Sequence, residues 1–89
     1  MLEIIRKDYI DSLTRLTYLT QLPDPTSLTR PIFFTTSNDI SFGDHTMLTY
    51  TKGIIIPTGN DASLIAIDYQ GNRYSAFCNT GKWVNFRKT

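Results

Sequence analysis

The chain of 89 residues has one cysteine, one histidine and no long apolar run. With Cys78 alone no internal disulfide can form, and because small secreted domains usually depend on such bridges, we expect a reducing cytoplasm. The longest aliphatic runs, Ile54–Ile56 and Leu64–Ile67, fall far short of the roughly 20 apolar residues that span a bilayer. Charges stand near the start, where a signal peptide needs an apolar stretch. We therefore expect a cytoplasmic protein with no membrane partner.

Side chains for catalysis or metal binding are equally scarce. His45 follows Asp44, but neighbours on a strand point to opposite faces, so the two are poorly placed to act as an acid–base pair. Cys78 would need His45 as its base, and a small core residue is the simpler interpretation. One histidine and one cysteine cannot build a structural zinc site. We predict a non-enzymatic protein with no catalytic residue, no metal and no cofactor.

No acidic residue occurs between Tyr69 and Thr89, although the whole chain has a net charge of only +1. Cations and aromatic side chains alternate there: Tyr69, Arg73, Tyr74, Phe77, Lys82, Trp83, Phe86, Arg87 and Lys88. This mixture suits base stacking with phosphate contacts, or the anchors of a protein interface. A cationic edge strand that merely discourages aggregation has the same composition.

The N-terminal part shows a helical period. Apolar side chains recur every three or four residues, at Leu2, Ile5, Tyr9, Leu13, Leu16 and Leu19. This spacing predicts an amphipathic helix over about residues 2–22, although the threonines at 14, 17 and 20 each weaken it by roughly a few tenths of a kcal/mol. Pro23 and Pro25 end the helix and open a connector over 23–31. Within it, Asp24 and Pro25 resemble the cap and first position of one short helical turn.

Residues 32–89 are rich in β-formers and are cut by frequent turns. The predicted β-forming runs are 32–36, a brief 40–42, 47–50, 54–56, 64–69, 73–78 and 83–87, of which five or six are expected to form strands, with residues 57–61 as a loop. Gln70-Gly71-Asn72 joins two of them as a hairpin, and apolar residues on both faces of 64–69 indicate a central strand or one covered on both sides. We predict a single α+β domain over 1–89, with the helix packed on a five- or six-stranded antiparallel curled sheet or on a small barrel of the SH3 or OB type.

Strand alternation assigns faces near the C-terminus. Arg73, Ser75 and Phe77 should oppose Tyr74, Ala76 and Cys78. In the last strand, Val84 and Phe86 are expected to fill the core while Trp83 points outward, an assignment that a single bulge would reverse. The predicted binding residues are Arg73, Tyr74, Lys82, Trp83, Arg87 and Lys88.

Together these features favour a small binding protein that acts as an inhibitor, adaptor or accessory subunit of another protein. A phage- or plasmid-encoded inhibitor of a host enzyme would suit the size. The alternative is a small-barrel protein that binds single-stranded nucleic acid, with about two to four phosphates neutralised by the C-terminal cations. The near-neutral total charge favours the protein partner. A symmetric homodimer that buries Trp83 or an edge strand is a third option.

Overall fold

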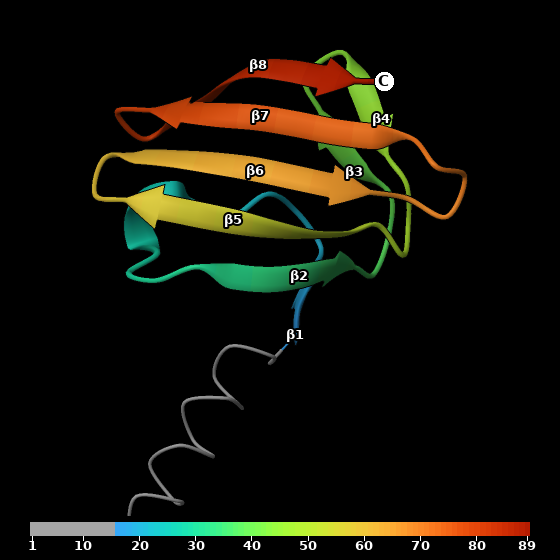
Figure 1. Ribbon diagram of the computed structural model, residues 1–89, viewed down its shortest axis with the longest axis horizontal. Coiled ribbons are helices and arrows are strands. Elements are labelled where there is room, and N and C mark those ends of the chain that lie inside the picture. The colour runs from blue at the N-terminus through green and yellow to red at the C-terminus, as the bar shows by residue number, and fades with distance from the viewer. Residues whose placement is uncertain (1–15) are drawn as a thin grey trace, which may run out of the picture.

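The computed structural model describes residues 16–89, and they form two β-sheets. The strands are β1 (Leu16–Leu19), β2 (Ile32–Thr36), β3 (Ile40–Phe42), β4 (His45–Met47), β5 (Lys52–Thr58), β6 (Asp61–Ile67), β7 (Arg73–Asn79) and β8 (Lys82–Lys88). Six of them make one sheet in the order β1-β2-β5-β6-β7-β8, while β3 and β4 form a separate hairpin (Figure 1). Strand β1 runs parallel to β2, and the other neighbours are antiparallel.

The β6–β7 hairpin shows most directly how the sequence sets the sheet. Along β6 the side chains of Ala62, Leu64 and Ala66 are buried, whereas the residues between them are exposed. Asp68 closes the turn by accepting hydrogen bonds from the backbone N–H groups of Gln70 and Asn72, both at 2.9 Å. The predicted hairpin around Gln70-Gly71-Asn72 and the central position of its first strand are confirmed.

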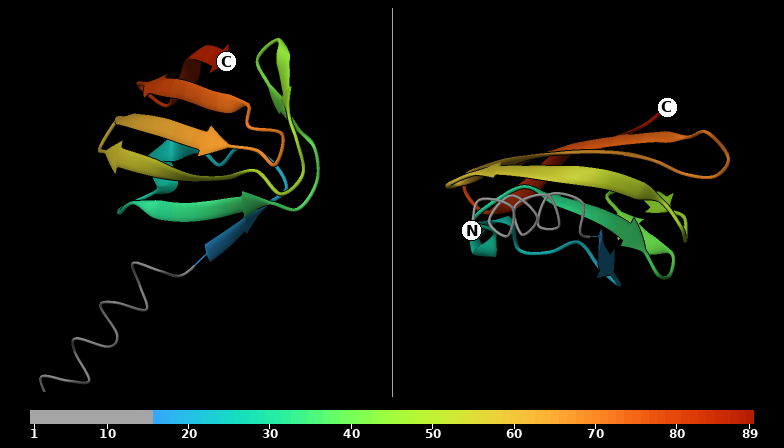
Figure 2. Two further views of the ribbon diagram at one scale, coloured as in Figure 1. Left: turned by 45° about the vertical axis from the view of Figure 1, so that its right-hand side comes forward. Right: turned by 60° about the horizontal axis from the view of Figure 1, so that its bottom comes forward.

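Two segments cover one face of the large sheet. The first is the crossover over residues 20–31, which joins β1 to its parallel neighbour β2 as such pairs require. It contains a 3₁₀ turn, Pro25–Ser27, which contacts β6 and is capped by Asp24 as the sequence predicted. The second is the β3–β4 hairpin. Figure 2 shows both on the same side of the curved sheet.

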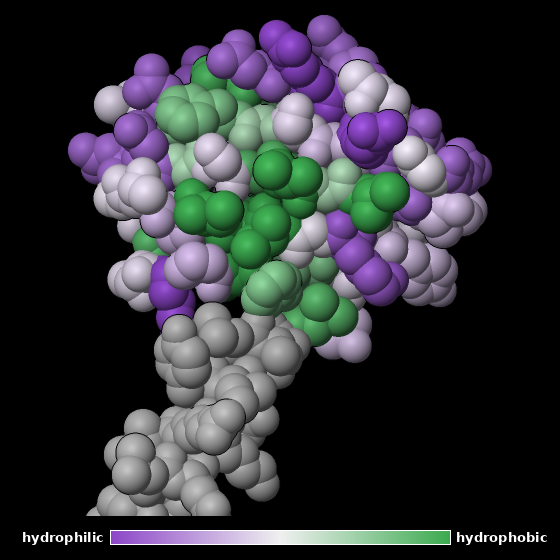
Figure 3. Space-filling view, viewed as in Figure 1, coloured by the Kyte–Doolittle hydropathy of each residue, from purple (hydrophilic) through white to green (hydrophobic). Residues whose placement is uncertain are grey.

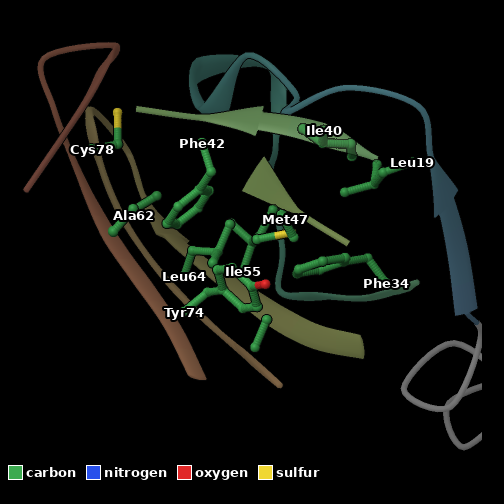
Figure 4. Close-up of a cluster of buried hydrophobic side chains, with 12 residues drawn as sticks. Leu19, Phe34, Ile40, Phe42, Met47, Ile55, Ala62, Leu64, Tyr74 and Cys78 are labelled. Atoms are coloured by element: carbon green, nitrogen blue, oxygen red, sulfur yellow. The ribbon is translucent and has the colours of Figure 1, made fainter. Parts of the chain in front are cut away.

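The core lies between the sheet and these two segments (Figure 4). The sheet contributes Leu19, Phe34, Ile55, Leu64 and Tyr74, and the β3–β4 hairpin contributes Ile40, Phe42 and Met47. Alanines 62, 66 and 76 leave room for the hairpin's larger side chains. Phe42 meets two rings edge-on, Tyr74 at 5.6 Å and Phe86 at 4.8 Å between centroids. Such pairs stabilise by about 0.5–1.5 kcal/mol beyond burial, so they fix the hairpin to β7 and β8.

The predicted α+β class is wrong, and so is the described end of the predicted helix, residues 16–22. Leu16–Leu19 is strand β1, residues 20–22 continue into the crossover, and no α-helix occurs within residues 16–89. The earlier part of that prediction, residues 1–15, lies outside the described residues. Backbone pairing with β2, from Leu16 opposite Phe33 to Leu19 opposite Thr36, overrides the helical period. Thr17 and Tyr18 are residue types that favour an extended strand.

The sheet is also neither purely antiparallel nor closed. Strands β1 and β8 are its two edges and do not pair with each other, so no barrel forms in the described part of the chain. The side expected to carry the helix is covered by the crossover and the hairpin. Strands β2 and β3 have the predicted bounds, whereas β4 ends at Met47 instead of running over 47–50. Strand β5 continues through Pro57, which was predicted as a loop.

Replacing Gly43 should test how tightly the hairpin is seated. Gly43 has φ +61°, and an added Cβ would lie 2.7 Å from the Phe86 ring. We expect Gly43→Ala to lower the free energy of unfolding by roughly 2–4 kcal/mol, from backbone strain and displacement of Phe86 together. The measurement is urea denaturation. Gly71→Ala is the matched control, because Gly71 also has positive φ but faces open space. Equal losses in the two variants would contradict the close packing of Gly43 on Phe86.

Candidate functional site

The second face of the large sheet carries a band of exposed apolar side chains, which we call the open face. Its exposed apolar members are Leu16, Phe33, Ile56, Ile65, Ile67 and Phe77, and the half-buried Ile54 and Val84 lie on the same face. The strand register aligns Leu16, Phe33, Ile54 and Ile65 in one row across four strands. Ile65 is 61% exposed and Ile67 53% exposed, although both lie on the central strand β6. Figure 3 shows apolar side chains gathered at the centre of this face, with paler and hydrophilic side chains around and between them.

A patch of this kind departs from the usual pattern of a half-covered sheet. An antiparallel sheet with one solvent-facing side normally alternates apolar residues inward with polar residues outward. Here the outward side of the central strands β5 and β6 carries four isoleucines, Ile54, Ile56, Ile65 and Ile67, among its polar residues. The exposed parts of the band's side chains add up to an apolar area on the order of 500 Å², toward the upper end for a monomer, where such patches mark interaction sites.

Cations surround this apolar band. Lys52, Arg73 and Arg87 lie on the open face, and Lys82 stands opposite Asn79 near one end of β7 and β8. Strand alternation puts only one described carboxylate, Asp61, on the same side. Within residues 16–89, Arg73, Lys82 and Arg87 form no ion pair. The open face is therefore apolar at its centre and positive around it.

A shallow hollow of about 350 Å³ lies in the open face beside β8. The side chains around it are Ser63, Ile65, Ser75, Phe77, Asn85 and Arg87. A bulge in β8 forms one side: the register shifts between the partners of Ser75 and Phe77, and Asn85 takes φ +55°. Serines on β6 and β7 give the hollow its depth, because larger side chains would fill it.

The same bulge corrects the predicted faces of the last strand. Val84 lies opposite Phe77 on the open face, whereas Trp83 lies opposite the buried Cys78 and packs half-buried against the core. The Trp83 Nε1–H group donates a hydrogen bond to the Pro23 carbonyl oxygen at 3.0 Å. The prediction that Trp83 points outward is therefore wrong. The extra residue in the bulge also puts Phe86 against Phe42, on the core side as expected.

The six predicted binding residues do not share one surface. Arg73 and Arg87 lie on the open face, as does Phe77, so the predicted alternation along β7 is confirmed. Tyr74 is buried at 1% exposure, and Lys88 lies on the covered side with its Nζ atom 5.5 Å from the Tyr74 ring centre. Sequence reasoning missed the isoleucines of β5 and β6. Their signal was present, because the 64–69 strand carries apolar residues on both faces and 89 residues leave little chain to cover both.

Tyr74 joins a buried polar pair rather than a binding surface. Its hydroxyl donates to Asp68 Oδ2 at 2.7 Å. Burial, with the hydrogen bond and negative charge of Asp68, raises the pKa of Tyr74 from 10.0 to about 12. Burial also acts to raise the pKa of Asp68, but hydrogen bonds from Tyr74, Asn72 and Gln70 outweigh it and hold this pKa below its usual value. Both shifts favour the folded protein with Tyr74 neutral and Asp68 ionised.

The residues weighed for catalysis lie apart from the open face. His45 is exposed at the start of β4, while Cys78 is buried in the core with its Sγ atom 3.7 Å from the Asn60 carbonyl oxygen. Residues 16–89 hold no cluster of three or more His, Cys, Asp or Glu side chains placed to bind a metal ion. The same part of the chain has no helix with the length and hydrophobicity needed to span a membrane.

Comparisons with protein families, with curated proteins and with solved structures each gave no match to this chain. We therefore infer the function from the surface of the molecule, and above all from the open face.

The Asp68–Tyr74 pair makes stability depend on pH in a defined direction. The fold raises the pKa of Tyr74. The stabilisation that the neutral Tyr74 hydroxyl gives the folded protein is therefore fully present below pH 10.0 and is lost as the pH rises toward about 12. We expect Tyr74→Phe to be less stable than the wild type by roughly 1–3 kcal/mol at pH 7, since the Asp68 carboxylate loses a buried donor. Urea denaturation at several pH values should show this difference shrinking above pH 10. A difference that stays constant up to pH 12 would contradict the pairing.

Trp83 should behave as a structural residue. We expect Trp83→Phe to lower the free energy of unfolding by roughly 1–3 kcal/mol, because the Pro23 carbonyl loses its donor. Lys82→Ala, at the neighbouring exposed position, should change it by less than about 0.5 kcal/mol. Thermal and urea unfolding of both variants is the measurement. A fully stable Trp83→Phe protein would mean that the indole does not hold the crossover to β8.

Proposed function

We propose that this protein is a non-enzymatic binding module that docks the open face of its sheet onto another protein, as an inhibitor, adaptor or accessory subunit. The observation that carries the proposal is the exposure of Ile65 and Ile67 on the central strand β6. We place this function in the cytoplasm, with the buried free thiol of Cys78 as support.

The energetics of the open face suit an interface of ordinary size. Burying on the order of 500 Å² of apolar surface yields a gross gain of about 12 kcal/mol at 25 cal/mol per Å². Association costs are of similar magnitude, about 4–15 kcal/mol, so the apolar band needs a polar surround to give useful affinity. The cations beside the band can supply it, and band and surround together approach the roughly 800 Å² per partner of a standard interface. Isoleucines on strands are also stiff, so little side-chain entropy is lost on binding.

The make-up of the open face supports a protein partner over nucleic acid. Base stacking needs flat aromatic rings, and the centre of the face is built from branched aliphatic side chains. The exposed rings on the face, Tyr18 at 72%, Phe33 at 39% and Phe77 at 38%, stand on β1, β2 and β7, away from the central strands β5 and β6. Of the C-terminal aromatics, Tyr74 and Trp83 face the core.

Replacing one isoleucine tests the proposal. Affinity purification from nuclease-treated extract of the native host should recover a stoichiometric protein with the wild type, and Ile65→Asn should reduce its recovery about tenfold or more. The reason is that a polar amide at the centre of a desolvated interface is poorly satisfied. Tyr50→Asn is the matched control, because Tyr50 is 66% exposed but lies in the turn after β4.

Circular dichroism and thermal unfolding must show both variants folded. Equal recovery with Ile65→Asn and with the wild type would show that the open face is not the interface. Material that disappears with nuclease treatment would favour the nucleic-acid alternative. A wild-type protein that sediments as a dimer, with Ile65→Asn monomeric, would assign the face to self-association.

A further inference from the structure

We infer that the partner presents an acidic side chain flanked by apolar ones, and that its carboxylate docks in the hollow beside Arg87. The inference rests on the proposed function and specifies the chemistry of the segment that the open face would bind.

The polar groups around the hollow are suited to an acceptor. They are the hydroxyls of Ser63 and Ser75, the Asn85 amide and the Arg87 guanidinium. None of these side chains makes a hydrogen bond within residues 16–89. All four can donate, and a guanidinium binds a carboxylate through paired, charge-assisted hydrogen bonds. A carboxylate therefore matches this set better than a cation or an apolar group.

The hollow is large enough to hold one side chain of a partner. Its volume of about 350 Å³ lies near the lower limit of small-molecule pockets, roughly 300–1,000 Å³. Such pockets enclose most of their ligand, whereas this one is a shallow depression in an open sheet. Ile65 and Phe77 beside it continue into the apolar band, so an occupant anchored there would extend over apolar surface. This arrangement fits one polar anchor within a larger apolar contact.

Charge across the whole face indicates the same partner. Among residues 16–89, the open face carries four cations, Lys52, Arg73, Lys82 and Arg87, and one carboxylate, that of Asp61. Most other described carboxylates are engaged elsewhere: Asp24 caps the 3₁₀ turn, Asp39 accepts hydrogen bonds from Thr49, and Asp68 is buried. A second copy of this chain would bring mainly cations against cations, which is unfavourable. An acidic partner segment is complementary to this surface.

The bulge at Asn85 links the hollow to the fold. A left-handed backbone at a residue other than glycine is uncommon, and bulges often redirect a side chain beside a functional site. Without the extra residue, strict alternation from the covered Trp83 would place Arg87 on the covered side. With it, Arg87 lies opposite Ser75 on the open face while Phe86 keeps its contact with Phe42. The bulge thus positions the cation that the inference needs.

Selection from a displayed library of random 16-residue peptides tests the inference with a defined probe. Peptides retained by the wild-type protein should share an acidic residue next to apolar ones. Fluorescence anisotropy of the synthesised peptides should show Arg87→Gln weakening binding about tenfold or more, as expected for a charge-assisted contact. Arg73→Gln is the control, because Arg73 is an open-face cation that does not line the hollow; its effect should stay below about threefold.

A second variant tests occupancy of the hollow. Ser75→Val keeps a β-forming residue in β7 but fills the space with methyl groups, and it should also weaken binding about tenfold while leaving unfolding little changed. Selected peptides that depend on Ile65 but not on Arg87 or Ser75 would overturn this inference and leave the proposed function standing. Peptides that depend on none of the three positions, or a failure to retain any peptide, would count against both.

Discussion

Phe42 packs edge-on against Tyr74 and Phe86. Because this contact holds the β3–β4 hairpin on one face of the sheet, the covering of that face depends on it. The hairpin lies next to the crossover that carries Leu22, Pro25 and Leu28. Alanines on β6 and β7 make the covered face shallow enough for both segments. Once these segments lie together on one side, no other described part of the chain remains to cover the second side. An exposed apolar face is thus a direct consequence of where the covering layer packs.

The bulge in β8 serves both the core and the candidate site. The residue added at Asn85 lets Phe86 reach Phe42 while Arg87 faces the other way, into the hollow. Phe86 and Arg87 are neighbours, so strand alternation alone puts them on opposite faces. Trp83, however, stands three residues before Phe86 and also packs against the core. A regular strand would turn one of these two rings away from the core, and a bulge is the smallest change of phase that keeps both there while Arg87 faces the hollow.

Local turn chemistry predicted the parts of the fold that depend on local interactions. Gly71 and Asp68 set the β6–β7 hairpin, and Asp24 with Pro25 set the 3₁₀ turn, so both were predictable. The end of the predicted helix failed because pairing of Leu16–Leu19 with β2 is a long-range contact that periodicity does not contain. The prediction that Trp83 points outward failed for a related reason, since strict alternation along a strand holds only until the first bulge. The open face was encoded in the two apolar sides of β6, but its exposure depends on how the whole chain packs.

The β8 edge of the sheet bears on how the molecule associates. Strand β8 is bulged and carries Lys82, Arg87 and Lys88, and both features discourage edge-to-edge pairing. The exposed isoleucines at 56, 65 and 67 have the opposite effect, because they add an aggregation risk that threonine, which also favours strands, would avoid. A bulged, cationic edge at β8 together with an exposed apolar face supports the proposal that association occurs through that face. Since stability of the strands does not require isoleucine there, the isoleucines support the proposed binding function as well.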